Sequence, residues 1–109
     1  MQIVLKKQIE IYVERNGQSP FVNWLEALDP LIRFRVKERL DRVALGNFGD
    51  YKQINKDIFE LRLTFGAGYR IYFYKEDSKI ILLLSGGNKS TQKKDIKKAI
   101  SYLNDYLDE

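Results

Sequence analysis

The sequence contains neither cysteine nor histidine. Without cysteine there is no disulfide framework, no thiol nucleophile and no redox motif. Without histidine, the side chain that most often acts as general base and as zinc ligand is missing as well. Only carboxylates could then hold a metal ion, and no acidic cluster has the alternating spacing of a calcium-binding loop. We therefore expect neither a metal nor a cofactor.

Long hydrophobic runs are also missing. The longest aliphatic run, 80–84, is far too short to cross a bilayer. At the N-terminus the charged residues follow the apolar ones, which is the reverse of a signal peptide. We therefore expect a cytoplasmic protein. A chain of 109 residues is large enough for one domain with its own core, which we place at 1–109.

Positive charge is in excess. The chain has 19 Lys and Arg against 15 Asp and Glu, a net charge of +4. All the basic residues lie before position 100, whereas Asp105, Asp108 and Glu109 fall in the last five positions, so the body without this tail carries +7, from 19 basic against 12 acidic residues. A basic body suits a polyanionic partner, but a solvated charged surface explains it equally well.

Turn and capping residues divide the chain into strands and helices. β-branched residues predict a first strand over 2–12. Ser19-Pro20 and Asp29-Pro30 each place an N-cap before a proline, which predicts two abutting helices that end at Leu28 and at about Leu45. A loop over 47–53 is followed by strands at about 57–65, 69–75 and 79–85, and a last helix begins after Ser90 or Thr91.

Both long helices carry apolar residues at helical spacing. The stripe of the second helix is Ile32, Val36, Leu40 and Val43, and the stripe of the last helix is Ile96, Ile100, Leu103 and Leu107. The order β-α-α-β-β-β-α predicts an α+β fold in which an antiparallel sheet packs against helices on one side.

Polar and charged residues alternate with apolar ones along two neighbouring strands. Gly66-Ala67-Gly68 predicts a three-residue hairpin loop, which would pair Arg62 with Tyr72 and Thr64 with Arg70. The apolar residues would then face the helices. The face left open would carry Glu60, Arg62, Arg70, Tyr72 and Tyr74.

This open face is suited to RNA, because arginines clamp phosphate and tyrosines stack on bases. RNA can be cut without histidine or metal if the 2′-hydroxyl is aligned with the neighbouring phosphorus and the charge on the phosphorane oxygens is neutralised. The alternative is an ordinary amphipathic sheet face whose charges pair with Glu60 and solvent, and the pattern alone favours that alternative slightly.

Three other segments could contact phosphate. Gly86-Gly87-Asn88-Lys89 offers backbone amides and a lysine between a strand and a helix, although a tight turn is at least as good an explanation. The arginines of the second helix alternate with acidic residues, which is typical of a solvated face. The last helix carries Lys93, Lys94, Lys97 and Lys98, for which solvation and RNA steering are both open.

Several separated blocks together resemble one known family. The blocks are 45–52 (LGNFGDYK), 60–62 (ELR), 68–73 (GYRIYF) and 83–89 (LLSGGNK), followed by Gln92 and Asp95-Ile96. In order and spacing they resemble the HigB-like addiction-module killer proteins, a branch of the RelE/ParE toxin superfamily with relatives in phages. The resemblance implies a RelE-like fold and the toxin of a bacterial type II toxin–antitoxin pair.

The resemblance also implies an activity and site residues. The best-known activity is cleavage of mRNA in the ribosomal A site, which leaves a 2′,3′-cyclic phosphate and a 5′-hydroxyl. Arg70 matches the superfamily's phosphate-binding arginine, and Arg62, Lys52 and Lys89 fall where other basic site residues occur. The face assignment adds Tyr72 to position a base, with Tyr74 and Lys93 as RNA contacts. Glu60 or a lysine could act as base, and Lys89 or a tyrosine as acid.

We therefore expect a metal-independent endoribonuclease that cuts mRNA on the ribosome. Its partner would be a small helix-turn-helix antitoxin, through which alone it would meet operator DNA. Some HigB toxins use a histidine that this chain lacks, and RelE has a C-terminal tyrosine for which Tyr102 and Tyr106 are possible counterparts. Two alternatives therefore stay open, a ParE-like inhibitor of DNA gyrase and a catalytically silent RNA-binding module.

Overall fold

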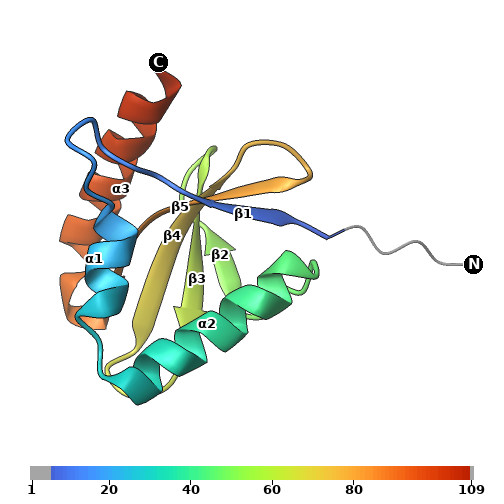
Figure 1. Ribbon diagram of the computed structural model, residues 1–109, viewed down its shortest axis with the longest axis vertical. Helices are drawn as coiled ribbons and strands as arrows, with labels where there is room; N and C mark the ends of the chain where they lie inside the picture. Colours follow the sequence, from blue (N-terminus) through green and yellow to red (C-terminus); the bar gives the residue numbers. More distant parts are fainter. Residues whose placement is uncertain (1–5, 109) are drawn as a thin grey trace, which may run out of the picture.

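A computed structural model describes residues 6–108 and shows a mixed α+β architecture with a five-stranded sheet and three α-helices (Figure 1). The elements are β1 (Gln8–Ile11), α1 (Pro20–Glu26), α2 (Pro30–Ala44), β2 (Tyr51–Gln53), β3 (Ile58–Leu63), β4 (Tyr69–Lys75), β5 (Ile80–Asn88), the 3-10 turn η1 (Lys89–Thr91) and α3 (Gln92–Leu107). The part of the expected first strand before residue 6 lies outside the described residues. Among the described helices, none combines the length and the apolar character that crossing a membrane requires.

The sheet has the strand order β1-β5-β4-β3-β2. Strands β2 to β5 pair antiparallel, as predicted, but β1 runs parallel to β5. The expectation of a wholly antiparallel sheet is therefore wrong at this edge. It is also wrong that 47–53 is only a loop, because Tyr51–Gln53 forms the short edge strand β2.

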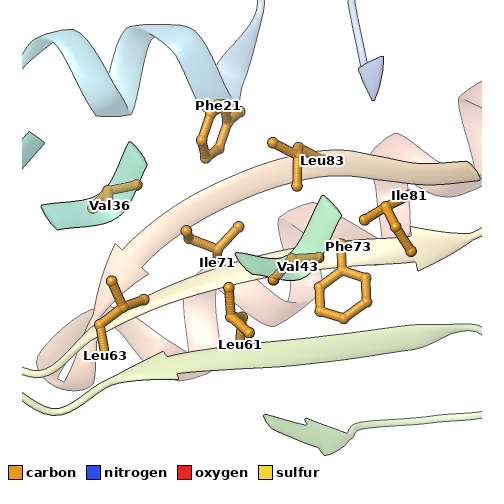
Figure 2. Close-up of a cluster of buried hydrophobic side chains, with 9 residues drawn as sticks. All are labelled: Phe21, Val36, Val43, Leu61, Leu63, Ile71, Phe73, Ile81 and Leu83. Carbon is orange, nitrogen blue, oxygen red and sulfur yellow. The ribbon is translucent and has the colours of Figure 1, made fainter. Parts of the chain in front are cut away.

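Helices cover both faces of the sheet, which corrects the prediction of helices on one side. One core joins α1 and α2 to the sheet through Phe21, Val36, Val43, Leu61, Leu63, Ile71, Phe73, Ile81 and Leu83 (Figure 2). A second core joins α3 to the opposite face through Tyr12, Ile58, Tyr72, Leu82, Leu84, Ala99 and Leu103. The apolar run of β5 requires this arrangement, because its side chains point alternately to both faces and all of them need cover.

The helices begin at the predicted prolines, but the Asp29 side chain makes no capping hydrogen bond, and α1 ends at Glu26 and not at Leu28. The Ser19 side chain accepts a hydrogen bond from the Val22 amide at 3.3 Å and so begins α1. Gly46 has φ +90°, the left-handed conformation that ends a helix, and its amide donates to the Val43 carbonyl at 2.8 Å. Local sequence therefore determines where α1 begins and where α2 ends.

The apolar stripes are confirmed for α2 but only in part for α3. In α2, Val36 and Val43 are fully buried. In α3, Leu103 is buried, but Ile100 and Leu107 are exposed and Ala99 is buried instead. The helix is rotated from the expected orientation, so that Asp95 also points toward the sheet and its carboxylate lies against Gly87.

Lys75 connects the edge strand β2 to the rest of the sheet. Its ammonium nitrogen lies 4.4 Å from the ring centroid of Phe59, 4.7 Å from that of Phe48 and 5.2 Å from that of Tyr51. A cation this close to aromatic faces is attracted by their negative quadrupoles. Lys75 therefore helps to hold β2 and the preceding loop against β3.

We expect Lys75→Met, which keeps the apolar stem but removes the charge, to lower the free energy of unfolding by about 1 kcal/mol. For a domain of this size the melting temperature should fall by roughly 4 °C or more. Lys79→Met, at an exposed position, is the matched control and should melt with the wild type. Equal melting of both variants and the wild type would show that the three rings contribute no such attraction.

Candidate functional site

The β3–β4 hairpin has a register two residues away from the predicted one. Arg62 lies opposite Arg70 and Glu60 opposite Tyr72, and the ladder closes with Leu63 opposite Tyr69. The loop is longer than expected because Gly66 and Gly68 both adopt left-handed conformations, with φ +57° and +73°, and give room for a wider turn. The two arginines therefore stand side by side on one face, where like charges repel unless an anion lies between them.

Glu60 supplies that anion and is fully buried. Its Oε1 accepts a hydrogen bond from Arg62 Nε at 3.1 Å. Its Oε2 accepts from the Tyr72 hydroxyl at 3.1 Å and from Gln92 Nε2 at 2.8 Å. Arg70 Nε lies 3.6 Å from the same Oε2. One carboxylate thus joins β3, β4 and the first turn of α3, and it fixes both arginines.

The protonation states follow from these contacts. Burial alone would raise the pKa of Glu60, but the hydrogen bonds from Gln92, Arg62 and Tyr72 together with the charge of Arg70 hold that pKa below its usual value. Burial and the neighbouring Glu60 carboxylate raise the pKa of Tyr72. Glu60 is therefore charged with its oxygens occupied, and Tyr72 keeps its proton. This geometry favours a positioning role for Glu60 over that of a free general base.

The expectation that the tyrosines lie on an open face is wrong. Tyr72 has an exposed fraction of 0%, because α3 packs over this face of the sheet through Ala99 and Leu103. Tyr74 packs against the same core and is only partly exposed. Tyr72 therefore has no ring surface on which a base could stack.

Arg62 and Arg70 contact Glu60 on their buried side and keep part of their surface in solvent. The Arg70 side chain is 14% exposed and the Arg62 side chain 33% exposed. Arg70 Nη1 donates to the Gly68 carbonyl at 2.8 Å, so the loop orients this guanidinium as well. Each guanidinium has five N–H donors, and the described residues take only one from each by hydrogen bonding. Donors are left over for an anionic ligand.

Two lysines extend this positive surface across the sheet. Lys52 of β2 is exposed and lies directly opposite Glu60. Lys89 is exposed, and its Cβ lies 3.7 Å from the position that a side chain on Gly68 would occupy, close to Arg70. We call Lys52, Arg62, Arg70 and Lys89 the cationic row. Lys93 is exposed in the first turn of α3, next to Gln92.

The segment 86–89 is neither of the turns that the sequence left open, a phosphate-binding turn or a tight strand-to-helix turn. β5 continues to Asn88, so Gly86 and Gly87 are strand residues opposite Ile71 and Arg70. A side chain on Gly86 would collide with the Trp24 ring, and one on Gly87 with the Asp95 carboxylate. The two glycines are therefore places where α1 and α3 approach the sheet closely.

We expect Gly87→Ala to destabilise the fold by about 1–3 kcal/mol, because the added methyl group overlaps a buried side chain. Chemical denaturation measures the loss. In the background of Asp95→Ala the overlapping carboxylate is gone. The step from Asp95→Ala to the double variant Gly87→Ala/Asp95→Ala should therefore cost less stability than the step from the wild type to Gly87→Ala. A single variant as stable as the wild type would contradict this packing.

Sequence reasoning gave no role to two residues that organise the site. Gln92 donates to Glu60. Its spacing in the sequence could have indicated this position, because Gln92 lies on the same side of α3 as Ile96, Ala99 and Leu103, which pack against the sheet. Arg39 donates to the backbone carbonyls of Arg62 at 2.7 Å and of Phe48 and Asp50 at 2.9 Å. Nothing in the sequence distinguishes Arg39 from the other arginines of α2.

The tyrosines near the C-terminus are engaged elsewhere. Tyr102 stacks on Tyr12 with ring centroids 5.4 Å apart, and the Tyr106 hydroxyl donates to Glu76 at 2.9 Å. Tyr102 lies ten residues beyond Gln92, about 15 Å along α3. These contacts give neither tyrosine a place beside the cationic row.

Comparison with known proteins places the chain in a family. Residues 23–103 match the family described as "Phage derived protein Gp49-like (DUF891)". An uncharacterized protein of Haemophilus influenzae is 46% identical over 80 residues, which cover 72% of this chain and 81% of that protein. Gp49-like proteins are a RelE-type, toxin-like family, commonly the toxins of toxin–antitoxin systems. The chain therefore belongs to the Gp49-like family of phage-derived, toxin-like proteins.

Proposed function

We propose that this chain is the toxin of a bacterial type II toxin–antitoxin system and acts as a ribosome-dependent mRNA endonuclease. The observation that carries the proposal is the cationic row, with Arg62 and Arg70 held side by side by the buried Glu60. Two adjacent guanidinium groups suit the phosphate of a scissile RNA linkage. Membership in a toxin-like family supports the same assignment.

In the proposed reaction the ribose 2′-oxygen attacks the adjacent phosphorus and the bond to the 5′-oxygen breaks. The products are a 2′,3′-cyclic phosphate and a 5′-hydroxyl. Arg70 and Arg62 would stabilise the extra negative charge on the phosphorane oxygens, which is the largest contribution that fixed donors can make here. Lys52 and Lys89 would bind the RNA backbone on either side.

Two protons must move in this reaction. The leaving 5′-oxygen needs a proton, and the exposed ammonium of Lys89 beside Arg70 is our candidate donor. The 2′-hydroxyl must lose a proton. Because the Glu60 oxygens already accept three hydrogen bonds, we assign this proton to solvent rather than to Glu60.

The test is induced expression in bacteria, followed by mapping of mRNA 5′ ends. We expect growth arrest together with new 5′-hydroxyl ends inside translated reading frames. The antitoxin is expected to be a helix-turn-helix protein encoded beside the toxin, and its co-expression should restore growth. Growth arrest with intact mRNA would overturn the nuclease proposal.

One observation favours a second candidate, a ParE-like inhibitor that binds DNA gyrase without cutting RNA. The cationic row consists of lysines and arginines, and the carboxylate next to it, Glu60, is fully buried and already accepts three hydrogen bonds, so no general base is evident among these described residues. This candidate predicts induction of the DNA-damage response in expressing cells. The nuclease proposal predicts its absence.

A further inference from the structure

A stripe of exposed residues runs along α2. Leu31, Arg35, Glu38, Arg42 and Leu45 follow one another at intervals of four and three residues and therefore share one side of the helix. The leucines at its two ends are 63% and 53% exposed, and Phe34, beside Leu31, is exposed as well. We call the five residues from Leu31 to Leu45, without Phe34, the α2 stripe. Leu31 and Phe34 together therefore expose apolar surface at one end of the stripe, and Leu45 does so at the other.

The middle of the α2 stripe borders a hollow of about 390 Å³. It is lined by Arg35, Glu38, Arg39, Arg42, Leu63, Thr64 and Phe65. The floor is Leu63, the last residue of β3, together with Thr64 and Phe65, just beyond the backbone hydrogen bond from the Arg62 amide to the Asp50 carbonyl. This part of the molecule is therefore a groove between α2 and the end of β3, in which Arg39 donates to the Arg62 carbonyl.

The charge of the groove is positive. Three arginines and one glutamate line it. Arg39 is engaged with backbone carbonyls, and the Arg35 guanidinium lies 5.1 Å from the centroid of the Phe65 ring. No ion pair of Arg35 or Arg42 occurs among residues 6–108. A ligand with carboxylates could therefore form ion pairs with Arg35 and Arg42.

We propose that the α2 stripe is the docking surface for an acidic amphipathic helix of the antitoxin. This inference rests on the proposed function for the identity of the partner. Two apolar side chains of that helix would contact Leu31 and Leu45, about 21 Å apart along α2. Carboxylates between them would pair with Arg35 and Arg42. Exposed leucines at the ends of the stripe fit a protein partner better than RNA, which offers few apolar groups.

The test measures the affinity of the purified chain for the helix-turn-helix protein encoded beside it, by isothermal titration calorimetry. Arg35→Glu/Arg42→Glu should weaken binding at least 100-fold, because the partner's carboxylates would meet like charges. Lys94→Glu/Lys98→Glu, the same charge change at exposed positions of α3, should bind within 3-fold of the wild type. Leu31→Ala/Leu45→Ala should weaken binding at least 10-fold.

Three outcomes would overturn the proposal. One is an α2 charge-reversal variant that binds like the wild type, which would leave the toxin–antitoxin pairing intact. Another is a neighbouring protein that does not bind the wild-type chain at all, which would refute that pairing as well. The third is a variant that binds the neighbouring protein normally but no longer co-sediments with ribosomes, which would make the α2 stripe an RNA contact. If the chain does not cleave mRNA, only the proposed nuclease activity is refuted. The docking proposal is tested separately, because binding of the two proteins is measured without RNA.

Discussion

Replacing Arg70 by alanine should reduce mRNA cleavage by at least 100-fold. Loss of one fixed donor to a developing oxyanion costs about 100- to 1,000-fold in rate, and Arg70 is the less exposed of the two arginines held by Glu60. Arg70→Lys should recover only part of the rate, because a lysine keeps the charge but not the planar fork. Rates are compared by counting cleaved ends on ribosome-bound mRNA at equal toxin concentration.

Arg70→Ala also has a structural cost, because its side chain is only 14% exposed and lies against Glu60. We expect a loss of about 1–3 kcal/mol in the free energy of unfolding, so activity must be measured well below the melting temperature of the variant. Arg33→Ala, on α2 and outside the cationic row, should cut at the wild-type rate. A folded Arg70→Ala that also cuts at that rate would contradict the role of Arg70.

Replacing Glu60 by glutamine should produce the largest loss of stability. Arg62 and Arg70 would then face each other with no anion between them, and breaking a buried ion pair from one side costs roughly 3 kcal/mol. The melting temperature should fall by roughly 10 °C or more. Glu38→Gln, at an exposed position of α2, is the control and should leave stability unchanged. Wild-type stability of Glu60→Gln would mean that the arginines do not depend on this carboxylate.

The same carboxylate predicts how stability depends on pH. The pKa of Glu60 in the folded protein lies below its ordinary value of 4.5. Its stabilisation is therefore fully present above that value and is lost as the pH falls through the lower, folded-state pKa. Denaturation curves between pH 7 and pH 3 should show a steeper loss of stability for the wild type than for Glu60→Gln. Parallel losses would contradict a lowered pKa.

Local sequence predicts the helices of this fold well because their boundaries depend on local chemistry. Ser19, Pro20 and Pro30 place the helix starts, and Gly46 ends α2. The strand alternation of β3 and β4 likewise places Leu61, Leu63, Ile71 and Phe73 on one face, as the structure shows, although the opposite face is not open. Each of these features depends on residues a few positions apart, so no knowledge of distant contacts is required.

The features that sequence reasoning missed depend on tertiary contacts. The hairpin register depends on the conformations of two glycines, and either a three-residue or a five-residue loop fits the same pattern. The run from Ile81 to Leu84 does indicate cover on both faces of the sheet, because a strand with apolar residues in succession is buried on both sides. That signal would have placed α3 over Tyr72 and closed the face predicted to be open.

The residues of the cationic row follow from the sequence, but the way in which Glu60 holds the two arginines does not. Arg62, Arg70, Lys52 and Lys89 come together as the sequence suggested. The position of Glu60 beneath them is a consequence of burial by α3 and of the hydrogen bond from Gln92, neither of which strand alternation can show. Whether these residues cut RNA stays a prediction.

The most direct measurement is cleavage of a defined mRNA by the purified chain in a reconstituted translation system. We expect cuts only when ribosomes occupy the mRNA, with 2′,3′-cyclic phosphate and 5′-hydroxyl ends, and a loss of at least 100-fold with Arg70→Ala. Intact mRNA in the presence of the folded wild-type chain, under conditions in which translation still stops, would contradict the account and leave inhibition without cleavage.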